Sequence, residues 1–176
     1  MLYQPLYCEE NAWHLCQTAQ VAGASPHVVV VSNEFGRVAM WSQRAAPADA
    51  PIAWDYHVFV VANTDGWHVW DPDFRLGIPA PLAEYIAASF VTVGVQPAKF
   101  DPEFRIMTGD AYRESLRSDR SHMLKQDGSW IAPPPDWPTI SDPAKGSNLR
   151  RFYDLSDEFI GTRGAIADLL QYFAEA

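Results

Sequence analysis

The chain has 176 residues, enough for one domain, residues 1–176, with a sizeable core that needs no cross-links. Its content of 48% apolar and 13% aromatic residues is typical of a packed globular protein and excludes a disordered one. The net charge of −9 and the pI near 4.8 argue against nucleic acid or an anionic membrane as partner, because both require a basic surface.

The two cysteines, Cys8 and Cys16, fall within one expected helix, two turns apart, and this separation is too large for a disulfide. Free thiols are typical of a reducing compartment. The first residues lack the basic and apolar regions of a signal peptide, and the longest aliphatic run, 28–31, is far too short for a membrane span. We therefore expect a cytoplasmic protein, separate from membranes and monomeric.

Taken in order, the elements predict an α/β (α+β) protein. A first helix is expected to run from about residue 7 to residue 21, because acidic residues in its first turn suit the positive end of the helix dipole. The apolar run 28–32 indicates a strand covered on both faces. Aromatic and β-branched residues predict another strand over 51–62, which a turn joins to a partner strand over 67–71. The other expected elements are a strand over 37–43, a helix over 81–90, a strand over 104–107, a short helix from Asp110 to Leu116, a polar loop over 118–123, extended chain over 133–138, and helices over 149–155 and 165–174.

The strand over 51–62 carries charged and polar residues in its middle, where a structural strand would have apolar ones. Alternation would place Asp55 and His57 on one face, and Trp54, Tyr56 and Val58 on the other. Taken alone, such buried polar residues are more often held by hydrogen bonds than used in catalysis. A catalytic interpretation therefore depends on partners elsewhere in the chain.

His57 can serve as a general base and then as an acid if a third group fixes its tautomer. A three-residue loop, 64–66, would pair the residues on either side of it and make His57 and Asp71 diagonal neighbours on one face. A two-residue turn would instead place them on opposite faces. Asp71 is the first candidate for the orienting acid, and Asp73 and Asp55 are the alternatives.

Cys8 is the candidate nucleophile, because a thiolate is favoured at a helix start and beside an imidazolium. The adjacent acids oppose ionisation, so a positive partner such as His57 is needed. The alternative is a small buried apolar residue, which is how we interpret Cys16. The histidines and cysteines lack metal-ligand spacing, and the sequence has no phosphate-binding glycine loop or nucleophile-elbow serine. We expect no metal and no cofactor.

Several segments together resemble the protein N-terminal glutamine amidohydrolase family, in the family's order and over nearly the whole chain. They are Tyr7–Asn11, Val31–Glu34, the Trp-Asp-Tyr-His-Val string at 54–58 that labels the family, Ser118–Met123, and the proline run before Trp137–Pro138. The resemblance implies an α-β-α sandwich with a mainly antiparallel sheet, similar to papain-like and transglutaminase-like cysteine hydrolases. It also implies that Cys8, His57 and Asp71 are the catalytic residues.

The implied reaction is deamidation of the N-terminal glutamine of a peptide or protein, through a γ-glutamyl thioester on Cys8, with release of ammonia. A free α-ammonium must then be bound, and a buried cation without a partner is costly. The residues expected to bind it or to shape the pocket are Glu10 and Asp119, with Tyr7, Asn11, Trp54 and Ser121. The structural alternatives are a helix-dipole role for Glu10 and a loop ion pair between Asp119 and Arg120.

Other functions share these residues. A cysteine protease or a transglutaminase-like acyltransferase would use the same triad, and a non-catalytic protein that binds N-terminal residues would use the same pocket. The pairing of Cys8 with His57 favours an enzyme.

Overall fold

The computed structural model describes the backbone of residues 1–176 and every side chain except that of Pro143. The strands are β1 His27–Ser32, β2 Val38–Met40, β3 Ile52–Trp54, β4 His57–Asn63, β5 Trp67–Trp70, β6 Ala80–Pro81, β7 Glu103–Thr108 and β8 Thr162–Gly164. The helices are α1 Cys8–Leu15, α2 Leu82–Ser89, α3 Gly109–Ser115, α4 Arg150–Tyr153 and α5 Ile166–Glu175, with 3₁₀ turns at Ala98–Phe100, Ser121–Met123 and Pro143–Lys145. Across the part of the chain described, none of the helices combines the length and apolar character needed to cross a membrane.

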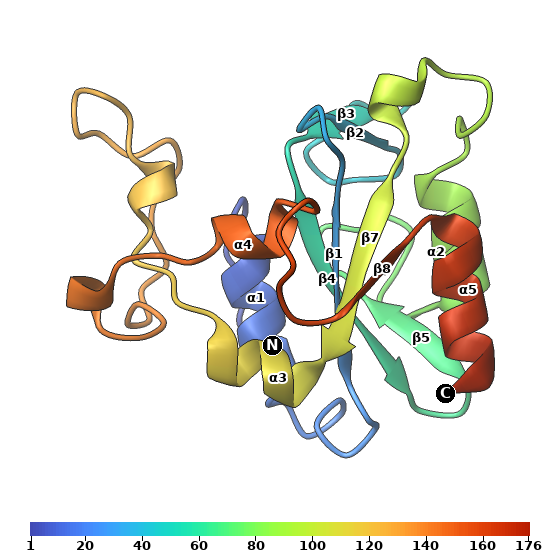
Figure 1. The fold of residues 1–176 in the computed structure, drawn as a ribbon, viewed down its shortest axis with the longest axis horizontal. Helices are drawn as coiled ribbons and strands as arrows, with labels where there is room; N and C mark the ends of the chain where they lie inside the picture. Colours follow the sequence, from blue (N-terminus) through green and yellow to red (C-terminus); the bar gives the residue numbers. More distant parts are fainter.

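The strands form a six-stranded sheet in the order β6-β5-β4-β1-β7-β8 and a separate pair of β2 with β3 (Figure 1). Every neighbouring pair of strands is antiparallel. The expectation of a mixed α/β protein with a mainly antiparallel sheet is confirmed.

Helices cover both faces of the large sheet, and β1 lies in its middle (Figure 1). Successive side chains of a strand point to opposite faces. Val28 and Val30 therefore pack in a core with residues of α1, α3 and α4, whereas Val29 and Val31 pack in a second core with residues of α2 and α5. This explains why β1 is an uninterrupted apolar run.

The predicted strand over 51–62 is in fact two strands, and the prediction of a continuous one is wrong. The chain bends at Asp55 and Tyr56, so β3 pairs with β2 while β4 joins the large sheet. The Asp55 side chain accepts a hydrogen bond from the Tyr56 N–H (3.0 Å), and Ser32 Oγ donates to the Asp55 carbonyl (2.8 Å). These local bonds take backbone groups that a strand ladder would use.

The bend also changes which side chains share a face. The rings of Trp54 and His57 stack with centroids 5.8 Å apart and planes 16° apart, so the predicted alternation is wrong for Trp54. Tyr56 and Val58 pack together in the core on the α1 side, as alternation predicted.

The hairpin between β4 and β5 has the predicted three-residue loop. Asn63 pairs with Trp67, and the register continues to Val60 opposite Trp70. Gly66 has a φ of 113°, a backbone conformation that favours glycine. This register brings the start of β4 and the residue after β5 to the same place, as the catalytic interpretation of His57 required.

Two helix boundaries differ from prediction. The first helix ends at Leu15 rather than at residue 21, because the N–H groups of Gln17 and Thr18 bond three residues back and Thr18 Oγ1 donates to the Leu15 carbonyl (2.9 Å). The cap of α3 is Thr108, whose hydroxyl accepts from the Ala111 N–H (3.2 Å), and not Asp110.

A buried arginine fixes the end of α4 and the segment that follows it. Arg105 on β7 is 1% exposed, a burial that an unpaired cation would not tolerate. Its guanidinium donates to the backbone carbonyls of Phe152, Asp154, Asp157 and Ile160. The segment held in this way includes Tyr153, which lines the cavity described next.

Candidate active site

A cavity of about 290 Å³ lies between the start of α1 and the bend that precedes β4. Its lining residues are Leu6, Cys8, Trp54, Asp55, Tyr56, His57, Asp73, His122, Met123, Ile131 and Tyr153. Four other cavities are larger, at about 370, 480, 620 and 720 Å³, but none of these four is lined by Cys8 or His57. The smaller cavity is therefore the one that the candidate nucleophile Cys8 and the candidate base His57 share.

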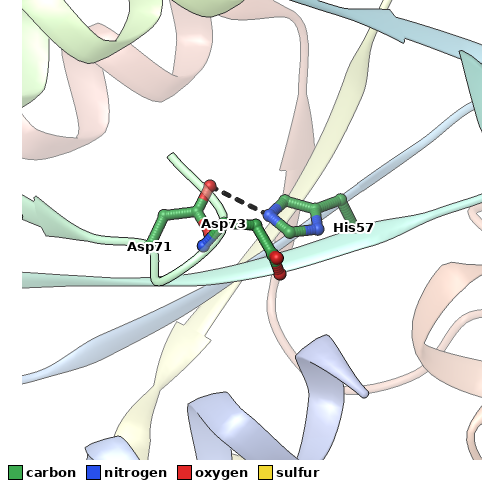
Figure 2. Close-up of side chains that lie close together, drawn as sticks. All are labelled: His57, Asp71 and Asp73. Atoms are coloured by element: carbon green, nitrogen blue, oxygen red, sulfur yellow. Dashed lines mark hydrogen bonds and ion pairs between the residues drawn. The ribbon is translucent and has the colours of Figure 1, made fainter. Parts of the chain in front are cut away.

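His57 and Asp71 form a buried pair. His57 Nε2 lies 3.0 Å from Asp71 Oδ2, and each residue is 1% exposed (Figure 2). Asp71 Oδ2 also accepts from Tyr85 Oη (2.8 Å) and from Gln43 Nε2 (3.4 Å), while Asp71 Oδ1 accepts from the Asp73 N–H (3.0 Å). The carboxylate is thus held on several sides, and it holds the imidazole in turn.

The charges of the pair favour an ionised carboxylate and a basic imidazole. Burial alone would lower the pKa of His57, but the charge and hydrogen bond of Asp71 outweigh it and the pKa is raised. Burial alone would raise the pKa of Asp71, but His57 and Tyr85 outweigh it and the pKa is lowered. His57 is therefore well suited to accept a proton.

Cys8 is the first residue of α1 and is partly exposed. Its Sγ lies 3.9 Å from Glu9 Oε2. Burial, followed by the charges of Glu9 and Asp73, raises the pKa of the Cys8 thiol well above its usual value, although the Val58 N–H opposes the rise. The helix start alone does not ionise this cysteine, so the resting form is a thiol. Cys16 is buried, and burial raises its pKa to about 12.

The two alternative orienting acids occupy different places. Asp73 is 6% exposed and lines the cavity, and its Oδ1 accepts from Tyr3 Oη (2.5 Å). Asp55 is exposed at the bend. Of the three acids, Asp71 is the one whose carboxylate forms the hydrogen bond to His57.

His57, Asp71 and Asp73 each place one potential metal-ligand atom within 4.8 Å of the others (Figure 2). Both oxygens of Asp71 already accept hydrogen bonds, from His57, Tyr85 and Gln43 on one and from the Asp73 N–H on the other. A metal ion would have to displace these donors, so the geometry fits an orienting carboxylate better than a metal ligand.

Glu10 does not line the cavity, contrary to the predicted substrate contact. It is fully buried, and its two oxygens accept from Arg120 Nε (2.9 Å) and Arg120 Nη2 (2.8 Å). Ser118 Oγ and Trp137 Nε1 donate to the same carboxylate, at 3.2 and 2.7 Å. The carboxylate is therefore committed to an ion pair that joins α1 to the segment after α3. Arg120 thus pairs with Glu10, and not with Asp119 as the structural alternative proposed.

The other expected substrate residues also face elsewhere, with the exception of Trp54. Asp119 Oδ1 accepts from the N–H and the hydroxyl of Ser121 (2.9 and 2.6 Å). Asn11 bonds the backbone of Gln4, and Tyr7 Oη donates to the Ala132 carbonyl (3.2 Å). Trp54 lines the cavity and stacks on His57.

Sequence reasoning missed a second pair beside Cys8, formed by buried Glu9 and partly exposed His122. Glu9 is fully buried, with Oε1 3.3 Å from His122 Nε2 and Oε2 accepting from Tyr56 Oη (3.3 Å). Burial lowers the pKa of His122, but Glu9 outweighs it and the pKa is raised. From the sequence, Glu9 is one of the first-turn acids that suit the positive end of the helix dipole. The signal that pointed to both residues was their position inside the segments 7–11 and 118–123 that carry the family resemblance.

Comparisons with known proteins show which family the chain resembles. The family model described as N-terminal glutamine amidase matches residues 3–175. A Bos taurus protein named Protein N-terminal glutamine amidohydrolase is 34% identical over 163 residues, which cover 89% of this chain and 79% of that protein. Proteins of the same name from Homo sapiens and Arabidopsis thaliana are 33% and 36% identical, over 97% and 88% of this chain and 85% and 75% of their own lengths.

Proposed function

The chain belongs to the N-terminal glutamine amidase family, and on that premise we propose that it deamidates the N-terminal glutamine of peptides or proteins, yielding N-terminal glutamate and ammonia. The observation that carries the proposal is the hydrogen bond from His57 to Asp71 in a cavity that Cys8 also lines. A nucleophile, a base and a group that orients the base are the parts required for acyl transfer. We propose a similarity to papain-like and transglutaminase-like cysteine hydrolases on the same grounds.

The first half of the reaction forms a thioester. Since His57 Nε2 is hydrogen-bonded to Asp71, Nδ1 is the ring nitrogen left to take the proton of Cys8. Because the resting Cys8 is a thiol, this transfer accompanies attack of Sγ on the carboxamide carbon. The carbon–nitrogen bond then breaks, and His57 gives its proton to the departing nitrogen, which leaves as ammonia.

The second half restores the enzyme. His57 removes a proton from water, whose oxygen attacks the thioester carbon. The carbon–sulfur bond breaks, the γ-carboxyl group of glutamate is released, and Cys8 recovers its proton from His57. In both halves the oxygen of the tetrahedral intermediate carries negative charge. We assign the stabilisation of this charge to the backbone N–H of Cys8, because the first N–H groups of a helix have no partner within it.

The cavity suits a positively charged substrate end group. Asp55 and Asp73 line it, and the Glu9 carboxylate lies directly behind Tyr56 and His122 in its wall. Asp55 is the exposed acid of this set, so we assign the substrate α-ammonium to Asp55 in place of Glu10 and Asp119.

Mass spectrometry of a glutamine-initiated peptide tests the function. Deamidation raises the mass of the peptide by about one dalton, with release of ammonia, because hydrolysis exchanges a side-chain amide for an acid. We expect no change in the N-acetylated peptide. Cleavage of the backbone would indicate a protease, incorporation of an added amine would indicate an acyltransferase, and binding without any reaction would indicate a non-catalytic protein; each result would contradict the proposal.

A further inference from the structure

Asp73 is a buried carboxylate in the wall of the catalytic cavity that the mechanism above does not use. Asp73 is 6% exposed, and it lines the same cavity as Cys8 and His57. Orienting His57 is already the work of Asp71, which forms the 3.0 Å hydrogen bond. Asp73 Oδ1 instead accepts a hydrogen bond from Tyr3 Oη, at 2.5 Å.

The position of Asp73 relative to the reacting groups is specific. One of its oxygens, a ring nitrogen of His57 and an oxygen of Asp71 all lie within 4.8 Å of one another, and Figure 2 shows the Asp73 carboxylate beside the His57 ring. Asp73 also lines the same cavity as Cys8. Asp73 therefore lies beside His57, within the cavity that Cys8 and His57 share.

The carboxamide nitrogen has to lie close to His57, because His57 protonates it as it leaves. A side chain beside His57 therefore lies near the carboxamide nitrogen. The carboxamide oxygen lies instead toward the backbone N–H at the start of α1. A primary amide nitrogen carries two N–H donors, and an ionised carboxylate is an acceptor only. Tyr3 donates to Asp73 Oδ1, and Asp73 Oδ2 is the remaining acceptor on this side chain.

We propose that Asp73 is a specificity residue that accepts a hydrogen bond from the side-chain amide N–H of the substrate and repels the γ-carboxylate of the product. This inference rests on the proposed deamidation. Glutamine and glutamate differ at the one group that contacts Asp73: the amide donates, whereas the carboxylate has no proton to donate and carries the same charge. Like charges held together in a poorly solvated site are strongly disfavoured, so product leaves and does not compete with substrate.

Replacement of Asp73 by asparagine tests the assignment through product binding. In Asp73→Asn the amide can donate to the product carboxylate, so the inhibition constant of the glutamate-initiated peptide should fall at least about tenfold, while kcat/KM for the glutamine-initiated peptide falls. The matched control is Asp65→Asn, which removes the same charge from the exposed loop between β4 and β5 and should leave both constants unchanged. A purely structural role for Asp73 would weaken binding of both peptides and would not tighten that of the product.

The outcomes separate this proposal from the others. Product inhibition that is unchanged or weaker in Asp73→Asn would overturn the proposal. So would loss, in this variant, of the preference for free over acetylated glutamine peptides, because that result would make Asp73 the site that binds the α-ammonium. If Asp73→Asn fails to fold, binding of the two peptides to the wild type still tests the proposal. A glutamate-initiated peptide that binds as tightly as the glutamine-initiated one would exclude a carboxylate that repels the product. If the wild type releases no ammonia at all, the proposed function itself has failed.

Discussion

At the scale of single residues, the pair of His57 and Asp71 is the part of the site that can be probed by pH. The base must be neutral to accept a proton, so activity rises as the pH increases through the raised pKa of His57. In Asp71→Asn the charge that raises this pKa is gone, so the acidic limb of kcat/KM should move to lower pH. The rate at the plateau should fall roughly 10³–10⁴-fold, because the imidazole loses its fixed tautomer. An acidic limb that stays at the same pH in Asp71→Asn would contradict the assignment of Asp71 as the acid that orients His57.

The sequence predicts that His57 and Asp71 lie together, as the structure shows, but it does not predict the residues that hold them. His57 and Asp71 were predicted together because hairpin register is a local property, set by a three-residue loop. Tyr85 on α2 and Gln43 in the chain after β2 donate hydrogen bonds to the Asp71 carboxylate. Tyr3, near the amino terminus, donates to Asp73. Such contacts depend on the packing of distant segments, which no local pattern reveals.

At the scale of elements, α1 and the segment after α3 are joined by the buried ion pair of Glu10 with Arg120. Arg120→Ala leaves a fully buried carboxylate without its cation, so the free energy of unfolding should fall by roughly 3–5 kcal/mol, measured by urea denaturation. Arg150→Ala is the control, because Arg150 forms an exposed pair with Asp154 and should leave stability unchanged within error. Equal effects of the two substitutions would show that the buried pair does not join these elements.

The elements themselves were predicted where the pattern was strong. Apolar β1, the β4–β5 hairpin and the C-terminal helix agree closely with the predicted ranges. The bend at Asp55 and Tyr56 was missed because aromatic and β-branched residues continue on both sides of it, so the pattern alone indicates one strand. It is this bend that turns Trp54 toward His57 and opens the cavity there.

At the scale of the whole molecule, the three proposed catalytic residues come from parts of the chain that the fold brings together. Cys8 begins α1, His57 begins β4, and Asp71 follows β5, whose antiparallel pairing with β4 returns the chain to the same end of the sheet. His122, from the segment after α3, completes the cavity wall. The family resemblance predicted that these segments belong together, whereas the elimination of Glu10 and Asp119 as cavity residues required the packed structure.

The central claim is that Cys8 is the nucleophile, and paired cysteine variants test it most directly. Ammonia release from a glutamine-initiated peptide should be reduced by roughly 10³-fold or more in Cys8→Ala, as expected when a covalent nucleophile is removed. In Cys16→Ala, which lacks a buried cysteine outside the cavity, kcat should remain close to that of the wild type. Wild-type ammonia release by Cys8→Ala would contradict the account.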